Sequence, residues 1–280
     1  TKQVARKWGV KMIFSILVVC LNPGDKLRHT IESVLEQTES DYEILVKDGG
    51  STDGCIAMLP QDERIRVVSQ KDRGIYDAMN QAVAQASGEY FFFLNCGDCF
   101  CDAEVLAKVG EHIRSAEAKY AGEKRPPFIF YGNIEEELTG AVVQSNPSMD
   151  DFGCYRNVPC HQACFYSKAL FAGRGFDLSY RVRADYEHFL WAYYKAGAKT
   201  LYMPVTVSRY EGGGFSETRE NRKISEKEHR EIVKKYMPSR KVYRYRLIML
   251  LTLSGLRTWI ARNPVTAGAY NRIKRLLYKA

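Results

Sequence analysis

The segment from Gly88 to Asp98 reads G-E-Y-F-F-F-L-N-C-G-D, and it decides the fold. Its apolar run, residues 90–94, is short and suits a strand that is buried on both faces, as in the centre of a parallel sheet. Open α/β sheets bind ligands at the carboxyl ends of their strands. Because the polar residues Asn95 to Asp98 follow such an end, the same segment also predicts a binding site.

The flanking sequence alternates between strand and helix patterns. Such alternation predicts an α/β fold, Rossmann-like, with a mostly parallel sheet and flanking helices. Strands are predicted at 14–21, 42–46, 65–69, 128–131, 164–166 and 200–207, and helices at 26–37, 76–86, 103–118, 185–196 and 217–236.

Polar clusters follow three of the predicted strands, and each cluster has two interpretations. Asp48, which precedes two glycines, could accept hydrogen bonds from a nucleobase or ribose, or could simply form a turn. Asp98 could hold a hard divalent cation on phosphates, or could cap the helix at 103–118. The polar loop around Asn22 follows the predicted strand at 14–21 and is the third cluster expected at the carboxyl edge of the sheet.

Asp185 and the pair His161-Gln162 are further candidates for chemistry. Asp185 stands at the start of a predicted helix, where a carboxylate serves as a general base, as an N-cap or as a favourable charge at the helix dipole. The pair His161-Gln162 precedes a predicted strand, and a lone histidine in such a place is more often structural than catalytic.

Six motifs in this order resemble the inverting GT-A glycosyltransferases of family two. They are F-S-I-L-V-V-C-L-N, V-K-D-G-G-S-T-D-G, K-D-R-G-I-Y-D-A-M-N, G-E-Y-F-F-F-L-N-C-G-D, C-H-Q-A-C-F-Y and R-A-D-Y-E-H-F-L, with G-G-G-F-S as a further match. The resemblance covers residues 13 to about 230. It implies a single displacement, in which a base activates an acceptor hydroxyl and a metal ion neutralises the leaving nucleoside diphosphate.

The resemblance also implies a role for each matching residue. Asp185 would be the catalytic base, His161 and Gln162 would lie on the acceptor side, and Asp98 would hold Mn²⁺ or Mg²⁺. The donor nucleotide, expected to be that of a UDP-sugar, would contact Leu21, Asn22, Asp48, Gly50, Arg73, Gly74, Asp77, Asn80 and Asn95.

The sequence departs from the family pattern at the metal motif. Asn95 and Gly97 stand where many relatives carry aspartate, so Asp98 is the one carboxylate left. An ion held mainly by diphosphate and water remains compatible with this, because Mg²⁺-like ions use few protein ligands. The thinned motif also leaves an inactive, glycosyltransferase-like scaffold as an alternative.

The excess positive charge lies at the end of the chain. The formal net charge is +8, and residues 239–280 hold ten Lys or Arg and no acidic residue, which leaves 31 basic and 33 acidic side chains before them. Arginines and aromatic side chains surround a short apolar run, as in helices that lie on a membrane surface. A helix packed on the body, an oligomer contact and, as a weaker alternative, a nucleic-acid-binding segment are the other interpretations; no known nucleic-acid motif occurs.

Together these patterns predict an extension at 1–12, a glycosyltransferase domain at 13–238 and a basic amphipathic tail at 239–280. We expect a cytoplasmic enzyme at the inner face of the membrane, acting on a glycan or lipid-linked glycan; the sequence does not decide its oligomeric state. The apolar run at 13–21 loosely resembles a signal peptide, but a buried first strand fits better. The eight cysteines lack two separated C-x-x-C pairs, so reduced thiols are expected rather than a zinc site.

Overall fold

The computed structural model describes residues 13–120, 123–212 and 218–252. The chain divides into two compact units, one ending at Arg230 and one beginning at Glu231. The predicted extension at 1–12 and most of the predicted tail lie outside the described residues, as does most of the G-G-G-F-S motif.

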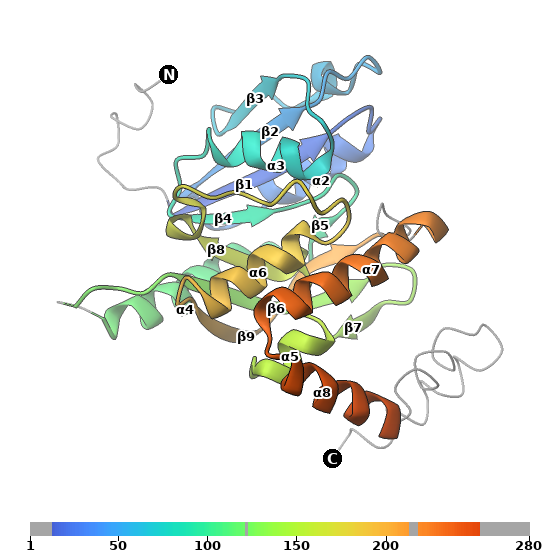
Figure 1. The fold of residues 1–280 in the computed structure, drawn as a ribbon. Helices are drawn as coiled ribbons and strands as arrows, with labels where there is room; N and C mark the ends of the chain where they lie inside the picture. Colours follow the sequence, from blue (N-terminus) through green and yellow to red (C-terminus); the bar gives the residue numbers. More distant parts are fainter. Residues whose placement is uncertain (1–12, 121–122, 213–217, 253–280) are drawn as a thin grey trace. The chain divides into compact units, whose positions relative to one another are not determined.

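The described strands form one sheet in the order β3-β2-β1-β4-β8-β6-β9-β5, with β7 paired to β6 (Figure 1). The strands are β1 Phe14–Cys20, β2 Tyr42–Asp48, β3 Ile65–Ser69, β4 Tyr90–Phe93, β5 Cys99–Phe100, β6 Phe128–Glu136, β7 Ala141–Val143, β8 Cys164–Ser167 and β9 Lys199–Tyr210. The helices are α2 Lys26–Leu35, α3 Ile75–Val83, α4 Val105–Ala118, α5 Asp151–Arg156, α6 Ala184–Tyr194, α7 Arg219–Tyr236 and α8 Ser239–Leu251.

The first four strands are parallel, and their register fixes the binding edge. Cys20 of β1 lies opposite Asp48 of β2, which lies opposite Ser69 of β3. The loops that follow these strands therefore leave the sheet at one edge, as expected for ligand binding in an open α/β sheet. Antiparallel pairing begins where β8 joins β4.

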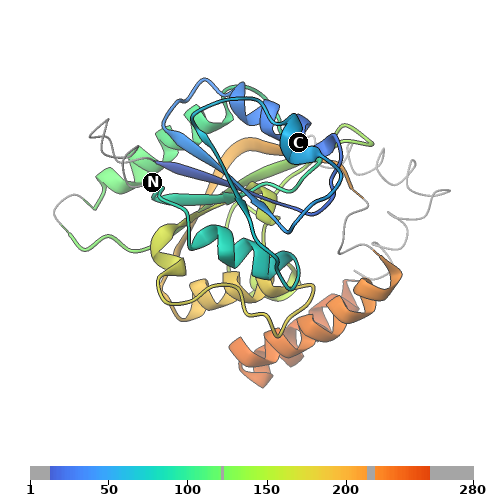
Figure 2. The same ribbon diagram turned by 90° about the horizontal axis from the view of Figure 1, so that it is seen from above.

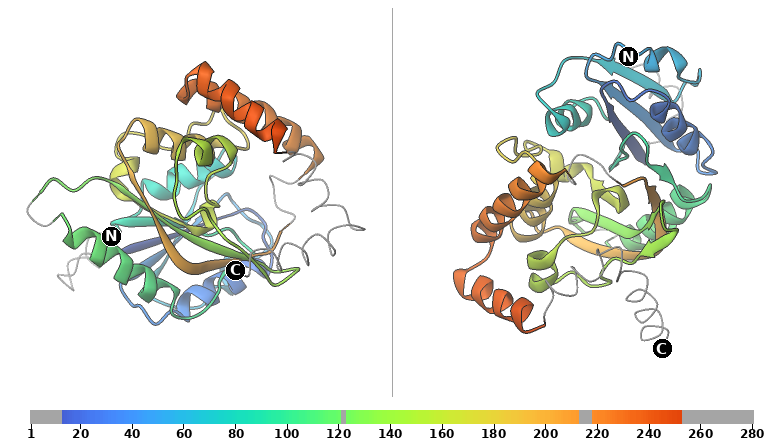
Figure 3. Two further views of the ribbon diagram at one scale, coloured as in Figure 1. Left: turned by 90° about the horizontal axis from the view of Figure 1, so that it is seen from below. Right: turned by 90° about the vertical axis from the view of Figure 1, so that its right-hand side faces the viewer.

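Helices cover both faces of the sheet (Figures 2 and 3). The aromatic side chains of β4 pack on both of these faces. Phe92 faces α2 and α4 and stacks on Phe165, with ring centroids 4.4 Å apart. Phe93 points to the opposite face, where it packs on Phe171 and Phe176. Each buried phenylalanine contributes about 1.5–3 kcal/mol of hydrophobic stabilisation, so β4 is a main source of cohesion.

The predicted α/β class is confirmed, and the differences concern short elements. The two-residue strand β5 and the helix α5 were not predicted. The predicted strand at 128–131 continues to Glu136, where it forms a hairpin with β7. Within the described residues no helix is long and apolar enough to cross a membrane.

Candidate functional site

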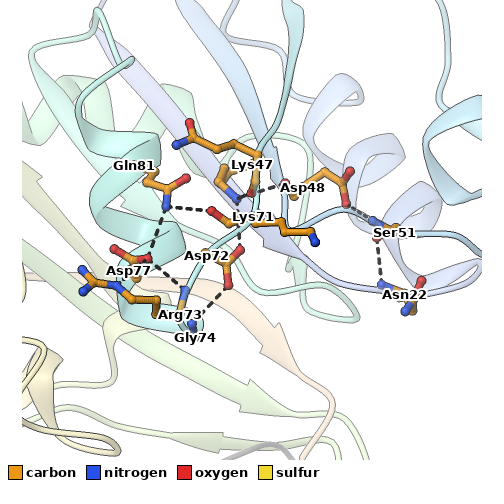
Figure 4. Close-up of polar contacts among 11 residues, drawn as sticks. Asn22, Lys47, Asp48, Ser51, Lys71, Asp72, Arg73, Gly74, Asp77 and Gln81 are labelled. Atoms are coloured by element: carbon orange, nitrogen blue, oxygen red, sulfur yellow. Dashed lines mark hydrogen bonds and ion pairs between the residues drawn. The ribbon is translucent and has the colours of Figure 1, made fainter.

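The loops after β1 and β2 are tied together at the carboxyl edge of the sheet (Figure 4). The backbone N–H of Asn22 donates to Ser51 Oγ at 2.8 Å, and Thr52 N–H donates to the Asn22 side-chain oxygen at 2.8 Å. Asn22 has a φ of 49°, a left-handed conformation that asparagine tolerates better than most residues. Leu21 beside it is 62% exposed.

Asp48 ends β2 and organises the loop that follows. Its carboxylate is 2% exposed and accepts the Ser51 N–H at 2.8 Å. Burial opposes ionisation, but hydrogen bonds from Ser51, Ser69 and Gly50 outweigh it, so the pKa of Asp48 lies below its ordinary value. Gly50 has a φ of 101°, which suits glycine. Asp48 therefore has the turn-forming role, and its donor contact stays a prediction.

Lys47 is a functional candidate that the sequence analysis missed. Its side chain is fully buried, and its ammonium group donates to the carbonyls of Asp48 and Gln70 and to Asp72 Oδ2, the last at 3.0 Å (Figure 4). The other oxygen of Asp72 accepts the Gly74 N–H at 3.1 Å. One buried cation thus joins the loop after β2 to the loop before α3. The signal was present, since lysine is unusual in an apolar strand.

The loop before α3 presents an exposed cation, Arg73, whose Nε lies 3.5 Å from the Asp77 carboxylate. Arg73 donates its backbone N–H to Asp77 Oδ2 at 2.9 Å, while its side chain is 80% exposed. Gly74 has a φ of 129°, in the region that favours glycine. Asn80 differs, because both ends of its amide bond the backbone of Phe176, at 2.9 and 2.7 Å. This gives Asn80 a structural role; a donor contact from it stays a prediction.

A cleft of about 280 Å³ lies next to these loops. The side chains that matter most for chemistry come from four separate segments and line it together: Tyr76, Asn95, His161, Gln162, Arg183 and Asp185. The structure therefore brings the predicted base, the two predicted acceptor-side residues and Asn95 to one place.

Asp185 is held in this cleft by two side chains. One carboxylate oxygen lies 2.9 Å from the Tyr76 hydroxyl, and the other lies 3.2 Å from His161 Nδ1. Burial opposes ionisation, but His161 and Tyr76 stabilise the carboxylate, so the pKa of Asp185 is lowered. Burial raises the pKa of Tyr76 well above its usual value, which keeps this hydroxyl protonated; its single proton is shared between the Val182 carbonyl, 2.7 Å away, and the Asp185 carboxylate. Asp185 is thus an ionised acceptor of protons near neutral pH.

His161 connects Asp185 to the end of β4. An ionised carboxylate only accepts hydrogen bonds, so Nδ1 of His161 must carry a proton. In the neutral ring Nε2 then accepts, and the Asn95 amide nitrogen lies 3.2 Å from it. The amide oxygen of Asn95 is buried without a hydrogen-bond partner among the described residues. A buried acceptor of this kind beside a cleft suits a ligand hydroxyl.

Glu228 fixes the backbone that presents Asp185. Its carboxylate, on α7, accepts the backbone N–H groups of Arg181, Val182 and Arg183 at 2.7, 3.0 and 2.9 Å. These donors precede α6, and the glutamate is 6% exposed. Sequence reasoning missed this residue, because nothing in a charged helix marks one glutamate as buried.

The side chain of Asp98 does not form a metal centre with its neighbours. It is 4% exposed, and its oxygens accept the Glu211 N–H and the Gln162 amide, both at 3.1 Å. Burial raises the pKa of Asp98. Over residues 13–120, 123–212 and 218–252, no group of three His, Cys, Asp or Glu could hold an ion. The alternative of a helix cap is wrong, since Glu104 precedes α4; Asp98 instead anchors the end of β9.

Comparison with known proteins identifies the family. The family model described as glycosyl transferase family 2 matches residues 15–135. A "PGL/p-HBAD biosynthesis glycosyltransferase" of Mycobacterium bovis is 34% identical over 213 residues, which cover 74% of this chain and 80% of the relative. A glycosyltransferase of Mycobacterium tuberculosis is 33% identical over 200 residues, covering 69% of this chain and 71% of that protein.

Solved structures support the same fold at lower sequence identity. Staphylococcus aureus TarS is 18% identical with a TM-score of 0.59, over 72% of this chain and 37% of that one. The mannosyltransferase PcManGT from Pyrobaculum calidifontis, solved with GDP-Man and Mn²⁺, is 15% identical with a TM-score of 0.52, over 75% of this chain and 60% of that one. The α/β fold is thus the GT-A fold of these enzymes, and the chain belongs to glycosyltransferase family 2.

Proposed function

We propose that this enzyme transfers a sugar from a UDP-sugar to a hydroxyl group of a glycolipid or lipid-linked glycan, with inversion at the anomeric carbon. The observation that carries the proposal is the position of Asp185 in the cleft, where Tyr76 and His161 lie 2.9 and 3.2 Å from its carboxylate oxygens. The M. bovis relative, a PGL/p-HBAD biosynthesis glycosyltransferase, supports a glycolipid acceptor. TarS structures with UDP and with UDP-GlcNAc support a uridine nucleotide.

Asp185 acts as the general base in this proposal. It removes the proton of the acceptor hydroxyl while that oxygen attacks the anomeric carbon, and the nucleoside diphosphate leaves from the opposite face. His161 and Tyr76 orient the carboxylate and keep it ionised. One displacement needs one base, so the cleft requires no second carboxylate as a nucleophile.

The donor occupies the loops after β1 and β2 and before α3. Asp48, whose position is fixed by its own loop, faces the nucleoside, and the exposed guanidinium of Arg73 approaches it from the α3 side. Asn22, Gly50 and Gly74 allow the backbone to come close. Leu21, Asp77 and Asn80 complete the predicted donor set, and the unpaired oxygen of Asn95 accepts a sugar hydroxyl.

The proposal includes a divalent cation but assigns no reaction step to it. Glycosyltransferases of this fold include PcManGT, solved with Mn²⁺. The residues around Asp98 form no centre by themselves, so Mn²⁺ or Mg²⁺ would take most of its ligands from the diphosphate and water.

The second unit supports a position at the cytoplasmic face of a membrane. In α8 the side chains of Leu247, Leu250 and Leu251 are exposed, and three arginines and one lysine share the helix. An exposed apolar and basic helix suits an anionic lipid surface.

The test is a panel of nucleotide sugars with the full chain. Binding is measured by calorimetry with Mn²⁺ or with chelator, and the released sugar is followed by NMR. We expect one UDP-sugar to bind and its product to have the inverted anomeric configuration. If no nucleotide sugar bound, the inactive scaffold would be the better interpretation. If the product retained the anomeric configuration of the donor, the single displacement would be excluded.

A further inference from the structure

A second, shallower hollow adjoins the cleft and is lined by three arginines. Arg156 ends α5, Arg183 precedes α6 and Arg230 lies on α7, and Glu226 and His229 complete the lining of a space of about 290 Å³. We call this site the arginine hollow. Three arginines against one glutamate leave it positively charged, whereas residues 1–238 as a whole carry slightly more acidic than basic side chains.

The arginines of the hollow lack the carboxylate partners that other arginines have. Arg174 and Arg209 pair with Glu187 and Glu135, the latter at 2.8 Å. Among the described residues no carboxylate forms an ion pair with Arg156, Arg183 or Arg230. Arg183 donates to Ser225 Oγ at 2.7 Å and lies over the Tyr186 ring, and Arg156 lies over the Phe152 ring. These contacts position the side chains of Arg156 and Arg183, and Glu226 in the lining offsets only part of the positive charge.

The hollow and the cleft that holds the base share one lining residue, Arg183. Arg183 and Ser225 line the cleft, Arg183 also lines the hollow, and Asp185 follows two residues later. Because Glu228 binds the backbone N–H of Arg183 at 2.9 Å, the position of this arginine relative to Asp185 is fixed. A molecule that bridges the two spaces would place an anionic group and a hydroxyl at a defined separation.

His229 adds a hydrogen-bonding atom to the hollow and no further charge. Its Nε2 lies 2.9 Å from the Tyr155 carbonyl, to which it donates, so Nδ1 faces away from that bond as an acceptor. Burial and the charge of Arg183 lower the pKa of His229, which keeps the ring neutral. The anion must therefore be bound by the guanidinium groups.

We propose that the arginine hollow binds a phosphate group of the acceptor while the acceptor hydroxyl reaches Asp185. This inference rests on the proposed transferase function. Guanidinium groups bind phosphate through paired, charge-assisted hydrogen bonds, and a phosphate offers three strong acceptor oxygens to the three arginines that line the hollow, whereas a carboxylate offers two. The acceptor class is thus a phosphate-bearing lipid or glycan.

The test uses farnesyl phosphate as the probe, with farnesol as its uncharged match. The full chain is first saturated with UDP, so that the donor loops are occupied. We expect farnesyl phosphate to bind, farnesol not to bind, and inorganic phosphate to compete. The double variant Arg156→Gln and Arg230→Gln should weaken farnesyl phosphate at least about tenfold, since each lost charge-assisted bond costs that much or more. Arg114→Gln, an exposed arginine of α4, is the matched control and should change nothing.

Equal affinity of the double variant and the native chain for farnesyl phosphate would overturn the inference. If that variant had in addition lost binding to phosphatidylcholine vesicles that contain phosphatidylglycerol, the hollow would be a membrane contact instead. UDP affinity and thermal unfolding of each variant report separately on the donor loops and on folding. If the chain bound farnesyl phosphate but no nucleotide sugar, the proposed transferase function would be refuted. Phosphate binding by the arginine hollow would still stand.

Discussion

At the scale of single residues, the proposed catalytic mechanism depends on the charge state of Asp185. Its carboxylate is ionised because His161 and Tyr76 outweigh the effect of burial. The carboxylate is half ionised at its folded pKa and almost fully ionised about two pH units above it, and that pKa lies below the usual value of about 3.9. The acid limb of kcat/KM that belongs to this base should therefore lie below the ordinary range of aspartate.

Replacing His161 should move that limb. In His161→Ala the carboxylate loses a charge-assisted hydrogen bond, so the pKa of Asp185 should rise and the acid limb of kcat/KM should shift upward by about one to two pH units. His161→Gln, which keeps a donor, should shift it less. A pH profile that is identical in all three proteins would show that His161 does not support the base.

A second histidine makes the fold sensitive to acid. His188 is fully buried, stacks on Phe171 at 4.3 Å and donates from Nε2 to the Leu170 carbonyl at 3.1 Å. Burial lowers the pKa of His188 to about 4, from 6.5 in the unfolded chain. Below pH 6.5 the unfolded chain binds the proton first, so stability falls as the pH falls towards 4.

This effect predicts a measurable slope. The free energy of unfolding should decrease by about 3 kcal/mol between pH 6.5 and pH 4 through this residue. His188→Gln should remove that part of the pH dependence in urea unfolding, and His29→Gln, on the exposed surface, should leave it unchanged. Equal slopes for both variants would contradict the assignment.

At the scale of elements, Lys47 couples two loops of the donor side. Lys47→Met leaves Asp72 without its cation and should lower the free energy of unfolding by about 3 kcal/mol. Donor affinity should fall as well, because the loops before and after β3 lose their common anchor. Adding Asp72→Asn should recover part of the stability, and Lys108→Met, an exposed matched lysine, should have no effect. A fully stable Lys47→Met chain with normal donor affinity would refute this coupling.

The loop after β4 carries Asp98, the predicted metal ligand. A single buried carboxylate, already bonded by Gln162 and Glu211, predicts that Mn²⁺ binds the chain weakly without donor and more tightly with UDP. Calorimetric titration of Mn²⁺ in both conditions checks this. Tight binding to the ligand-free chain would reveal a centre that the described residues do not form.

At the scale of the whole molecule, the sequence predicted the class of fold and much of the site. Periodicity sufficed for β1 to β4 and α2 to α4, because these elements alternate and bury regular faces. It did not reveal β5, whose two residues are defined by pairing with β9. Lys47, Tyr76 and Glu228 escaped for the same reason: their roles come from partners that are distant along the chain, as Tyr76 shows with Asp185.

Asp185 is proposed to act as the general base and not as a ligand of the donor. The most direct measurement compares Asp185→Asn with Asp102→Asn, an exposed matched carboxylate, for UDP-sugar affinity and for turnover. The account predicts unchanged affinity and a turnover reduced about 10²–10⁴-fold for Asp185→Asn, with Asp102→Asn like the native enzyme. Native turnover in Asp185→Asn, or a loss explained wholly by weaker donor binding, would contradict it.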